Sequence, residues 1–310
     1  MKSKNNKTVT KGIVFAGCSF TWGQGLYYYS NLDSLKEPPP HHYHSNLVRF
    51  SHYEYIKTIR FPRLVANHFN TFEVCQPFNG GATYSIIEWW ENCFGVNENT
   101  ATFWPGPGRS ESIRDDYNYP GHFFDDFSTI VYQCTQWPRS HSPAMIWKND
   151  HGDIVRTSHH NVMINQTEEF HKWLIENNLT LDQYVHNGLV QDINDIKRFL
   201  QNFEHNGVRA YIMTWPHDMV PYIKNDPWLS QRFIEFNYHG YNYTNIEQMM
   251  GYMHLQSVPH PELTIYRDLE SFTEPPQDHH PSLKCHQVIA DNVIRHIEAD
   301  QYRNRMNERT

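Results

Sequence analysis

Residues 12–26 read GIVFAGCSFTWGQGL, and the fold is organised around this stretch of the 310-residue chain. Residues 13–16 are apolar and partly β-branched, which predicts a short buried strand. The run stops at Gly17, and the residues after it are small, hydroxylic and punctuated by glycine. A strand that ends in this way brings Ser19 to the carboxyl edge of a sheet, where α/β proteins place their binding sites. A helix that began near Ser19 or Thr21 would direct its unpaired N–H groups at the same point and favour negative charge there.

Further apolar runs alternate with helical patterns along the rest of the chain. Strands are expected at residues 71–75, 128–134 and 208–214, and helices at residues 55–69, 86–94, 180–206, 228–236, 245–253 and from about 282 to 298. Strands that alternate with helices predict a parallel sheet wound on both faces, here with the first strand at its centre and the last helix packed beside that strand.

The expected helices carry recognisable start signals. Thr180 with Gln183 resembles a capping box at the start of the 180–206 helix. Pro281 lies just before or at the first turn of the last helix, and Ser282 is placed to cap it. His280 is therefore expected on a fixed loop at the amino end of that helix.

The composition bounds the class of protein. The net charge of -8 at pH 7, with histidine counted neutral, argues against binding to a nucleic-acid backbone. No run of eighteen apolar residues is present, which predicts no membrane span, and no signal peptide is apparent. The 5 cysteines form no paired framework, which favours a reducing compartment such as a cytoplasm.

The chain is expected to form one α/β domain over residues 1–310, with long loop insertions. Stretches rich in proline, glycine, histidine or aromatic residues mark these insertions near residues 27–54, 97–127, 139–170 and 216–265. Aromatic side chains in such loops suit contacts with sugars or with partner proteins.

The segment GCSFT at residues 17–21 resembles the first block of the GDSL or SGNH hydrolases, whose Gly-Asp-Ser signature carries the serine nucleophile. Cys18 occupies the middle position, a form that looks like versions of the family found in phage genomes. The resemblance implies a three-layer α/β/α sandwich with a mainly parallel, flavodoxin-like sheet, and it implies that Ser19 is the nucleophile.

The second and third blocks of that family supply the oxyanion hole. Gly80 and Gly81 lie between an expected strand and helix, where backbone N–H groups can approach a ligand closely. Gly81 matches the family's glycine, with Gly80 as the near alternative. The family's third block carries an asparagine that this sequence lacks; Gln136 is the nearest amide and Thr135 the nearest hydroxyl, and either can donate a similar hydrogen bond.

The last block of the family pairs an aspartate with a histidine that precedes proline and a helix. His280 followed by Pro281, with His286 one turn into the helix, matches this pattern. The usual spacing would place the aspartate at Gln277, so Asp278 is the carboxylate that the resemblance implies, and a Ser–His dyad is the alternative.

The resemblance implies a serine esterase. Ser19 would attack an ester carbonyl, His280 would accept and return the proton, and Asp278 would orient the imidazole. The N–H groups of Ser19 and Gly81 and the Gln136 amide would hold the oxyanion. The implied substrate is a small ester or an acetylated glycan, and no metal ion or organic cofactor is required.

Other functions remain open at this point. The chain could be a phage structural or adhesion component that kept the fold, with virion proteins or a second copy as its partners, located in the host cytoplasm or in the virion. A metallohydrolase using His159-His160 or His279-His280 is disfavoured, because adjacent histidines rarely converge on one ion. Cys18 is a conceivable nucleophile, whereas a lipidated Cys18 would need a longer apolar run before it.

Overall fold

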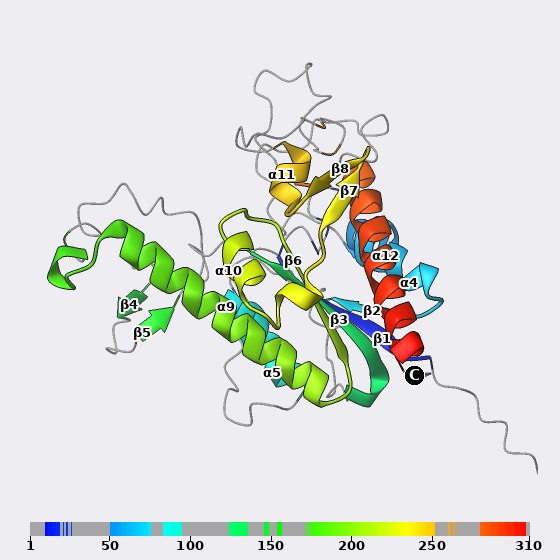
Figure 1. The fold of residues 1–310 in the computed structure, drawn as a ribbon, viewed down its shortest axis with the longest axis horizontal. Helices are drawn as coiled ribbons and strands as arrows, with labels where there is room; N and C mark the ends of the chain where they lie inside the picture. The colour runs from blue at the N-terminus through cyan, green and yellow to red at the C-terminus, as the bar shows by residue number, and fades with distance from the viewer. Residues whose placement is uncertain are drawn as a thin grey trace, which may run out of the picture.

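The computed structural model describes residues 10–18, 21, 23, 26, 50–75, 83–94, 124–135, 146–148, 154–156, 172, 174–251, 260, 263 and 280–307. Its main sheet has four parallel strands in the order β2-β1-β3-β6 (Figure 1). The strands are β1 (Gly12–Ala16), β2 (Glu73–Cys75), β3 (Phe127–Cys134) and β6 (Arg209–Thr214). The predicted strands and the central place of the first one are thereby confirmed.

A fifth extended segment continues the sheet beyond β6. Phe233 forms a parallel bridge with Ile212, and the N–H of Ile234 donates to the Ile212 carbonyl at 2.8 Å. With this segment in place, the strand order is that of a flavodoxin-like sheet, in which the winding direction reverses between β1 and β3.

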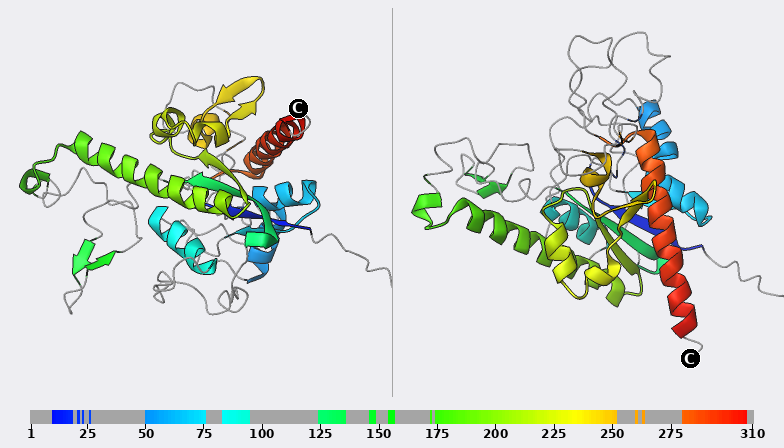
Figure 2. Two further views of the ribbon diagram at one scale, coloured as in Figure 1. Left: turned by 60° about the horizontal axis from the view of Figure 1, so that its bottom comes forward. Right: turned by 45° about the horizontal axis from the view of Figure 1, so that its top comes forward.

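Helices cover both faces of the sheet and make the three layers of an α/β/α sandwich (Figures 1 and 2). Successive strand residues point to opposite faces, so Val14 and Ala16 join one buried cluster and Ile13 and Phe15 join the other. The Val14 face packs against α5 (Thr83–Cys93), α9 (Leu181–His205) and α10 (Val220–Asn225). The Ile13 face packs against α4 (Phe61–His68) and α12 (Leu283–Asn307). The predicted fold class is confirmed.

The predicted start signals of α9 and α12 are present as hydrogen bonds. Thr180 Oγ1 accepts from the Gln183 N–H at 3.1 Å, and Gln183 Oε1 accepts from the Thr180 N–H at 2.9 Å, which completes the capping box. Ser282 Oγ accepts from the Cys285 N–H at 3.2 Å and so caps α12. Gly207 ends α9 with a φ of 79°, a conformation that suits glycine.

Proline divides the helical pattern expected at 55–69 into two helices. These are α3 (Phe50–Ile59) and α4, which are separated at Arg60. Pro62 occupies the first turn of α4, where its missing N–H costs nothing, because no earlier carbonyl of that helix would bind it.

The helix expected at residues 228–236 is wrong. The chain makes only a 3₁₀ turn at Ser230–Arg232 before it enters the hairpin of β7 (Phe236–Tyr238) and β8 (Tyr241–Tyr243). Both residues of the hairpin turn, His239 and Gly240, have positive φ, as a type I′ turn requires. α11 (Ile246–Met250) follows, and it is shorter than the expected 245–253 helix. A second hairpin, β4 (Ile146–Lys148) with β5 (Ile154–Arg156), lies within the expected insertion at 139–170.

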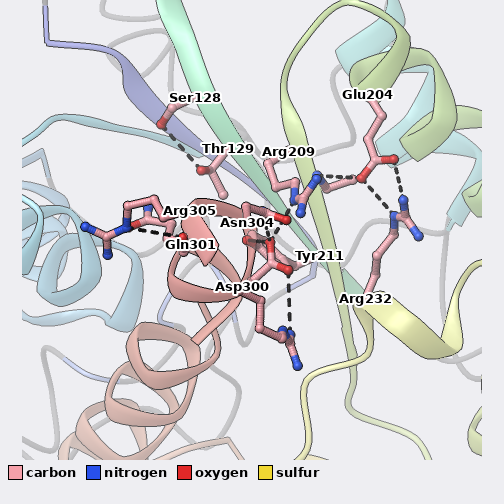
Figure 3. Close-up of polar contacts among 12 residues, drawn as sticks. Ser128, Thr129, Glu204, Arg209, Tyr211, Arg232, Asp300, Gln301, Asn304 and Arg305 are labelled. Carbon is pink, nitrogen blue, oxygen red and sulfur yellow. Dashed lines mark hydrogen bonds and ion pairs between the residues drawn. The ribbon is translucent and has the colours of Figure 1, made fainter. Parts of the chain in front are cut away.

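The direction of α12 is fixed by polar contacts at the amino edge of the sheet (Figure 3). Asp300, near the carboxyl end of α12, accepts from Arg209 Nε at 2.7 Å and from the Tyr211 hydroxyl at 2.9 Å. Burial alone would raise the pKa of Asp300, but these hydrogen bonds outweigh it and lower the pKa. Because β6 begins at Arg209, α12 runs antiparallel to the strands, and its amino end lies at their carboxyl edge.

In the part of the chain that the structure describes, no helix combines the length and the apolar character that crossing a bilayer requires.

Candidate functional site

The candidate site lies at the carboxyl edge of the sheet, where the strand order reverses between β1 and β3. Open α/β sheets bind their ligands in the crevice at this point, because the connections from the two strands leave towards opposite faces. Gly17 and Cys18 leave β1 there, and Thr135 leaves β3. Trp215 leaves β6 beside them, with its N–H donating to the Cys134 carbonyl at 3.4 Å.

A buried glutamine of β3 holds the segment that follows β1. Gln133 is fully buried, and its Oε1 accepts from Thr21 Oγ1 at 2.6 Å. Its Nε2 donates to Cys18 Sγ at 3.3 Å and to the Cys134 carbonyl at 3.2 Å. We call Gln133, Cys18 and Thr21 the Gln133 clamp. Its two β1-side members lie one residue before and two residues after Ser19.

Gly17 is required by the close packing of this clamp. A β-carbon at residue 17 would collide with Thr21 Oγ1 and would lie 2.9 Å from Gln133 Cβ. The glycine therefore lets the segment after β1 fold back directly onto β3. Strand β2 supports the same segment from the other side, where the Cys75 thiol donates to the Thr21 carbonyl at 3.9 Å.

His280 is half-buried at the amino end of α12, on the same edge of the sheet. The loop that carries it is tied down next to the cap, since the Ser282 N–H donates to the Leu263 carbonyl at 2.9 Å. A chain of ring contacts links this end of α12 to β1. His286 stacks on Phe61 at 5.8 Å, and Phe61 meets the ring of Phe15 edge-on at 5.6 Å.

His286 is a neutral imidazole buried behind His280. Its Nδ1 accepts from the Phe61 N–H at 3.1 Å, so the proton of the neutral ring is on Nε2. Burial above all, together with the nearby Arg60 and His280, lowers the pKa of His286 to about 3. Within the described residues, Nε2 has no hydrogen-bond partner.

Four of the five predicted site residues, Ser19, Gly81, Gln136 and Asp278, lie outside the described residues. Their roles and their distances from His280 therefore stay predictions. The structure does place Cys18, the neighbour of Ser19, and His280 at the same edge of the sheet. Thr135, the alternative oxyanion donor, is fully buried, and its hydroxyl has no hydrogen-bond partner within the described part of the chain.

The structure also bears on the rival site residues. The Cys18 side chain is fully buried and its sulfur accepts the Gln133 amide, which is the environment of a structural thiol. Of the paired histidines considered as metal ligands, only His280 is among the described residues. No group of three or more histidine, cysteine, aspartate or glutamate residues within those residues is arranged to hold a metal ion.

A second polar cluster at this edge was not predicted from the sequence. Glu247, in α11, is buried, and its Oε2 accepts from the His217 N–H at 3.1 Å. The pKa of Glu247 is raised to about 7, because burial and the charge of Asp218 raise it by more than the hydrogen bond from His217 lowers it. Asn245 caps α11 and brings its Nδ2 to 3.3 Å from His217 Nδ1. The sequence signal for this cluster is Asn245 three residues before Gln248, which marks a helix start beside a strand exit.

The sequence matches no family profile and no curated protein. Among solved structures, the chain can be superposed on an acetyl xylan esterase from the rumen bacterium Butyrivibrio proteoclasticus, with 12% sequence identity and a TM-score of 0.37. The superposition covers 96% of this chain and 64% of that protein. A likeness of this strength does not bear on the function. The class of protein is therefore the one defined by its own sheet: a flavodoxin-like α/β/α sandwich with a polar carboxyl edge.

Proposed function

We propose that this protein is a serine esterase of the SGNH type, with Ser19 as nucleophile and His280 as general base. The observation that supports this most directly is the placement of the two chain segments. The exit of β1, one residue before Ser19, and the amino end of α12, which carries His280, share the carboxyl edge of one sheet. In an α/β fold this is the edge where chemistry takes place.

In the proposed reaction, Ser19 Oγ attacks the ester carbonyl while His280 takes its proton. The tetrahedral intermediate then collapses, the C–O bond to the alcohol breaks, and His280 returns the proton to the departing alcohol oxygen. Water, deprotonated by His280, hydrolyses the acyl-enzyme and restores the serine. Asp278 would hold the imidazole in the tautomer that accepts the serine proton.

The oxyanion would be held by the N–H groups of Ser19 and Gly81 and by the Gln136 amide. One such donor is worth about 3 kcal/mol in the transition state. Gln136 follows directly on Thr135 at the exit of β3, next to the exit of β1, which is where a donor to the same oxygen is needed. The buried position of Thr135 favours Gln136 over Thr135 as that donor.

The nucleophile is tested by labelling with a fluorophosphonate probe, followed by peptide mapping. We expect wild-type protein to be labelled at Ser19 and to hydrolyse p-nitrophenyl acetate, and Ser19→Ala to lose both. Ser128→Ala is the matched control, because Ser128 is exposed at the opposite end of β3. Labelling that survives Ser19→Ala, or a wild type that is neither labelled nor active, would refute the proposal and favour a non-enzymatic role such as a virion component.

The proposed substrate class is a small ester, with an acetylated glycan as the natural example. Its support is the sequence, in which aromatic residues crowd the insertions that would surround the site. We expect acetate release from acetylated polysaccharides to exceed release from p-nitrophenyl esters with longer acyl chains. Equal or faster cleavage of long acyl chains would contradict this choice.

A further inference from the structure

We propose that Gln133 is a positioning residue of this site: its amide holds Cys18 and Thr21, on either side of Ser19 in the sequence, against β3 and keeps the Cys18 thiol buried. This inference rests on the proposed function for its catalytic half only. The structural half concerns described residues on both sides of Ser19 and stands on the geometry of the Gln133 clamp.

The position of Gln133 in the sheet makes the contact possible. Ala16 is paired with Tyr132 in the register of β1 and β3, so Gln133 lies beside Gly17, where β1 ends. Gly17 has no side chain, and the side chain of Thr21 and the Cβ of Gln133 occupy the space that one would fill. From there it reaches forward to Cys18 and Thr21 along the segment that leaves β1.

The chemistry of the clamp distinguishes it from ordinary core packing. Both amide hydrogens and one acceptor position of Gln133 are used, and all three members are fully buried. A glutamine inside a sheet covered on both faces costs free energy unless its amide is satisfied, and an apolar side chain would fill the space without that cost. What the amide adds is direction, since it fixes the two residues that flank Ser19 relative to β3.

The clamp also separates two neighbouring nucleophiles. Cys18 and Ser19 are adjacent in the sequence, and each carries a side chain that can act as a nucleophile. With the Cys18 thiol held against Gln133, the thiol is kept away from solvent. Loss of the clamp would therefore expose the thiol and, by the same movement, misplace the hydroxyl.

The first arm of the test measures the thiol and needs no catalytic activity. In a Cys93→Ser background, which removes the half-buried cysteine, we would follow iodoacetamide modification of Cys18 by peptide mapping. We expect Gln133→Met and Thr21→Val each to raise the rate about tenfold or more, because each removes a buried hydrogen bond that opposes local opening. Thr21→Ser, which keeps the hydroxyl, should react at nearly the wild-type rate.

A matched control separates the clamp from general destabilisation. Thr129→Val removes a buried hydroxyl from the same strand, four residues away from Gln133. Urea unfolding midpoints would report how much each variant is destabilised. At a comparable loss of stability, the Cys18 modification rate of Thr129→Val should stay near that of the wild type. Unchanged rates in Gln133→Met and Thr21→Val, or an equal rise in Thr129→Val, would overturn the proposal.

The second arm measures turnover of p-nitrophenyl acetate. We expect Gln133→Met to lower kcat about 10- to 100-fold with little change in KM, because a misplaced nucleophile affects the chemical step more than binding. The double variant Gln133→Met with Thr21→Val should have about the same kcat as the lower of the two single variants, because both substitutions remove the same hydrogen bond. A rise in thiol reactivity with unchanged kcat would overturn the catalytic half. If Ser19→Ala refutes the esterase, the thiol arm still decides whether Gln133 holds Cys18 and Thr21 in place.

Discussion

At the scale of single residues, the carboxyl edge of the sheet holds two buried titratable groups with opposite behaviour. His286 is kept neutral by burial and by its acceptor bond with the Phe61 N–H. Glu247 is kept protonated to higher pH than usual, again by burial. Because the pKa of each group differs between the folded and the unfolded state, each makes the free energy of unfolding depend on pH. His286 lowers that free energy as the pH falls, and Glu247 lowers it as the pH rises.

His286 should make the fold less stable in acid. Its pKa is about 3 when folded and about 6.5 when unfolded, so between these values the unfolded chain binds the extra proton. The free energy of unfolding should then fall by up to about 1.4 kcal/mol for each pH unit below 6.5. His286→Asn keeps an acceptor for the Phe61 N–H and should flatten this part of the curve in urea titrations from pH 7 to pH 4. Parallel curves for variant and wild type would contradict the prediction.

Glu247 should act in the opposite direction. Its folded pKa of about 7 lies above the ordinary value of 4.5, so the folded state holds the extra proton and loses stability as the pH rises through this interval. Glu247→Gln keeps the acceptor for the His217 N–H and cannot ionise. We expect its stability relative to wild type to grow by about 1–3 kcal/mol between pH 4.5 and pH 8, measured by urea unfolding. A difference that does not change with pH would show that Glu247 does not titrate in this range.

At the scale of secondary-structure elements, α9 and α12 are both capped by a hydroxyl, but only the cap of α12 adjoins the candidate site. Thr180→Ala and Ser282→Ala should each cost about 1 kcal/mol, because each leaves an N–H of the first turn without its partner. Only Ser282→Ala should also lower turnover of p-nitrophenyl acetate, since His280 lies two residues before the cap. Ser282→Asp keeps an acceptor and should restore both properties. Equal turnover losses in the two alanine variants would refute this link.

The elements that the sequence predicts well are those with local signals. The capping pair Thr180 and Gln183 and the apolar run of β3 identify their elements without reference to the rest of the chain. The error at 228–236 arose because its apolar residues fit a helical spacing, whereas the sheet edge at Ile212 recruits Ile234 into an extended segment. The β7–β8 hairpin has a local signal in Gly240, which permits the positive φ of a tight turn.

The site was predictable only in part, because its contacts join residues far apart in the sequence. The hydrogen bond between Thr21 and Gln133 joins residues 112 positions apart, and the sequence around either residue does not predict the other as its partner. A signal for Gln133 did exist, since a glutamine within an apolar buried strand must find a partner. The identity of that partner depends on the strand order, which the sequence predicts only as a class.

At the scale of the whole molecule, the polar contacts that join α12 to β6 lie at the edge of the sheet opposite the candidate site. The contacts of Asp300 with Arg209 and Tyr211 join α12 to the start of β6, away from His280 (Figure 3). Because the pKa of Asp300 is lowered on folding, its contribution is present above the ordinary carboxyl range and is lost in acid.

Asp300→Asn should therefore weaken the fold without affecting turnover. We expect a loss of about 1 kcal/mol at pH 7, a modest value because the Arg209 side chain is partly exposed to solvent. The kcat for p-nitrophenyl acetate should stay within about twofold of wild type, since the amino edge takes no part in positioning the nucleophile. A large fall in kcat, measured under conditions in which the variant is fully folded, would show that the amino edge of the sheet influences the candidate site.

The central place of β1 has a consequence for how the chain is made. A ribosome that has just produced β1 releases a strand whose two hydrogen-bonding edges are both open, and β3 is more than a hundred residues away. β1 must remain soluble through that interval, and His280 is synthesised later still, with α12. Nascent chains stalled before α12 should therefore be inert and prone to chaperone binding, and hydrolytic competence should appear abruptly once α12 can dock.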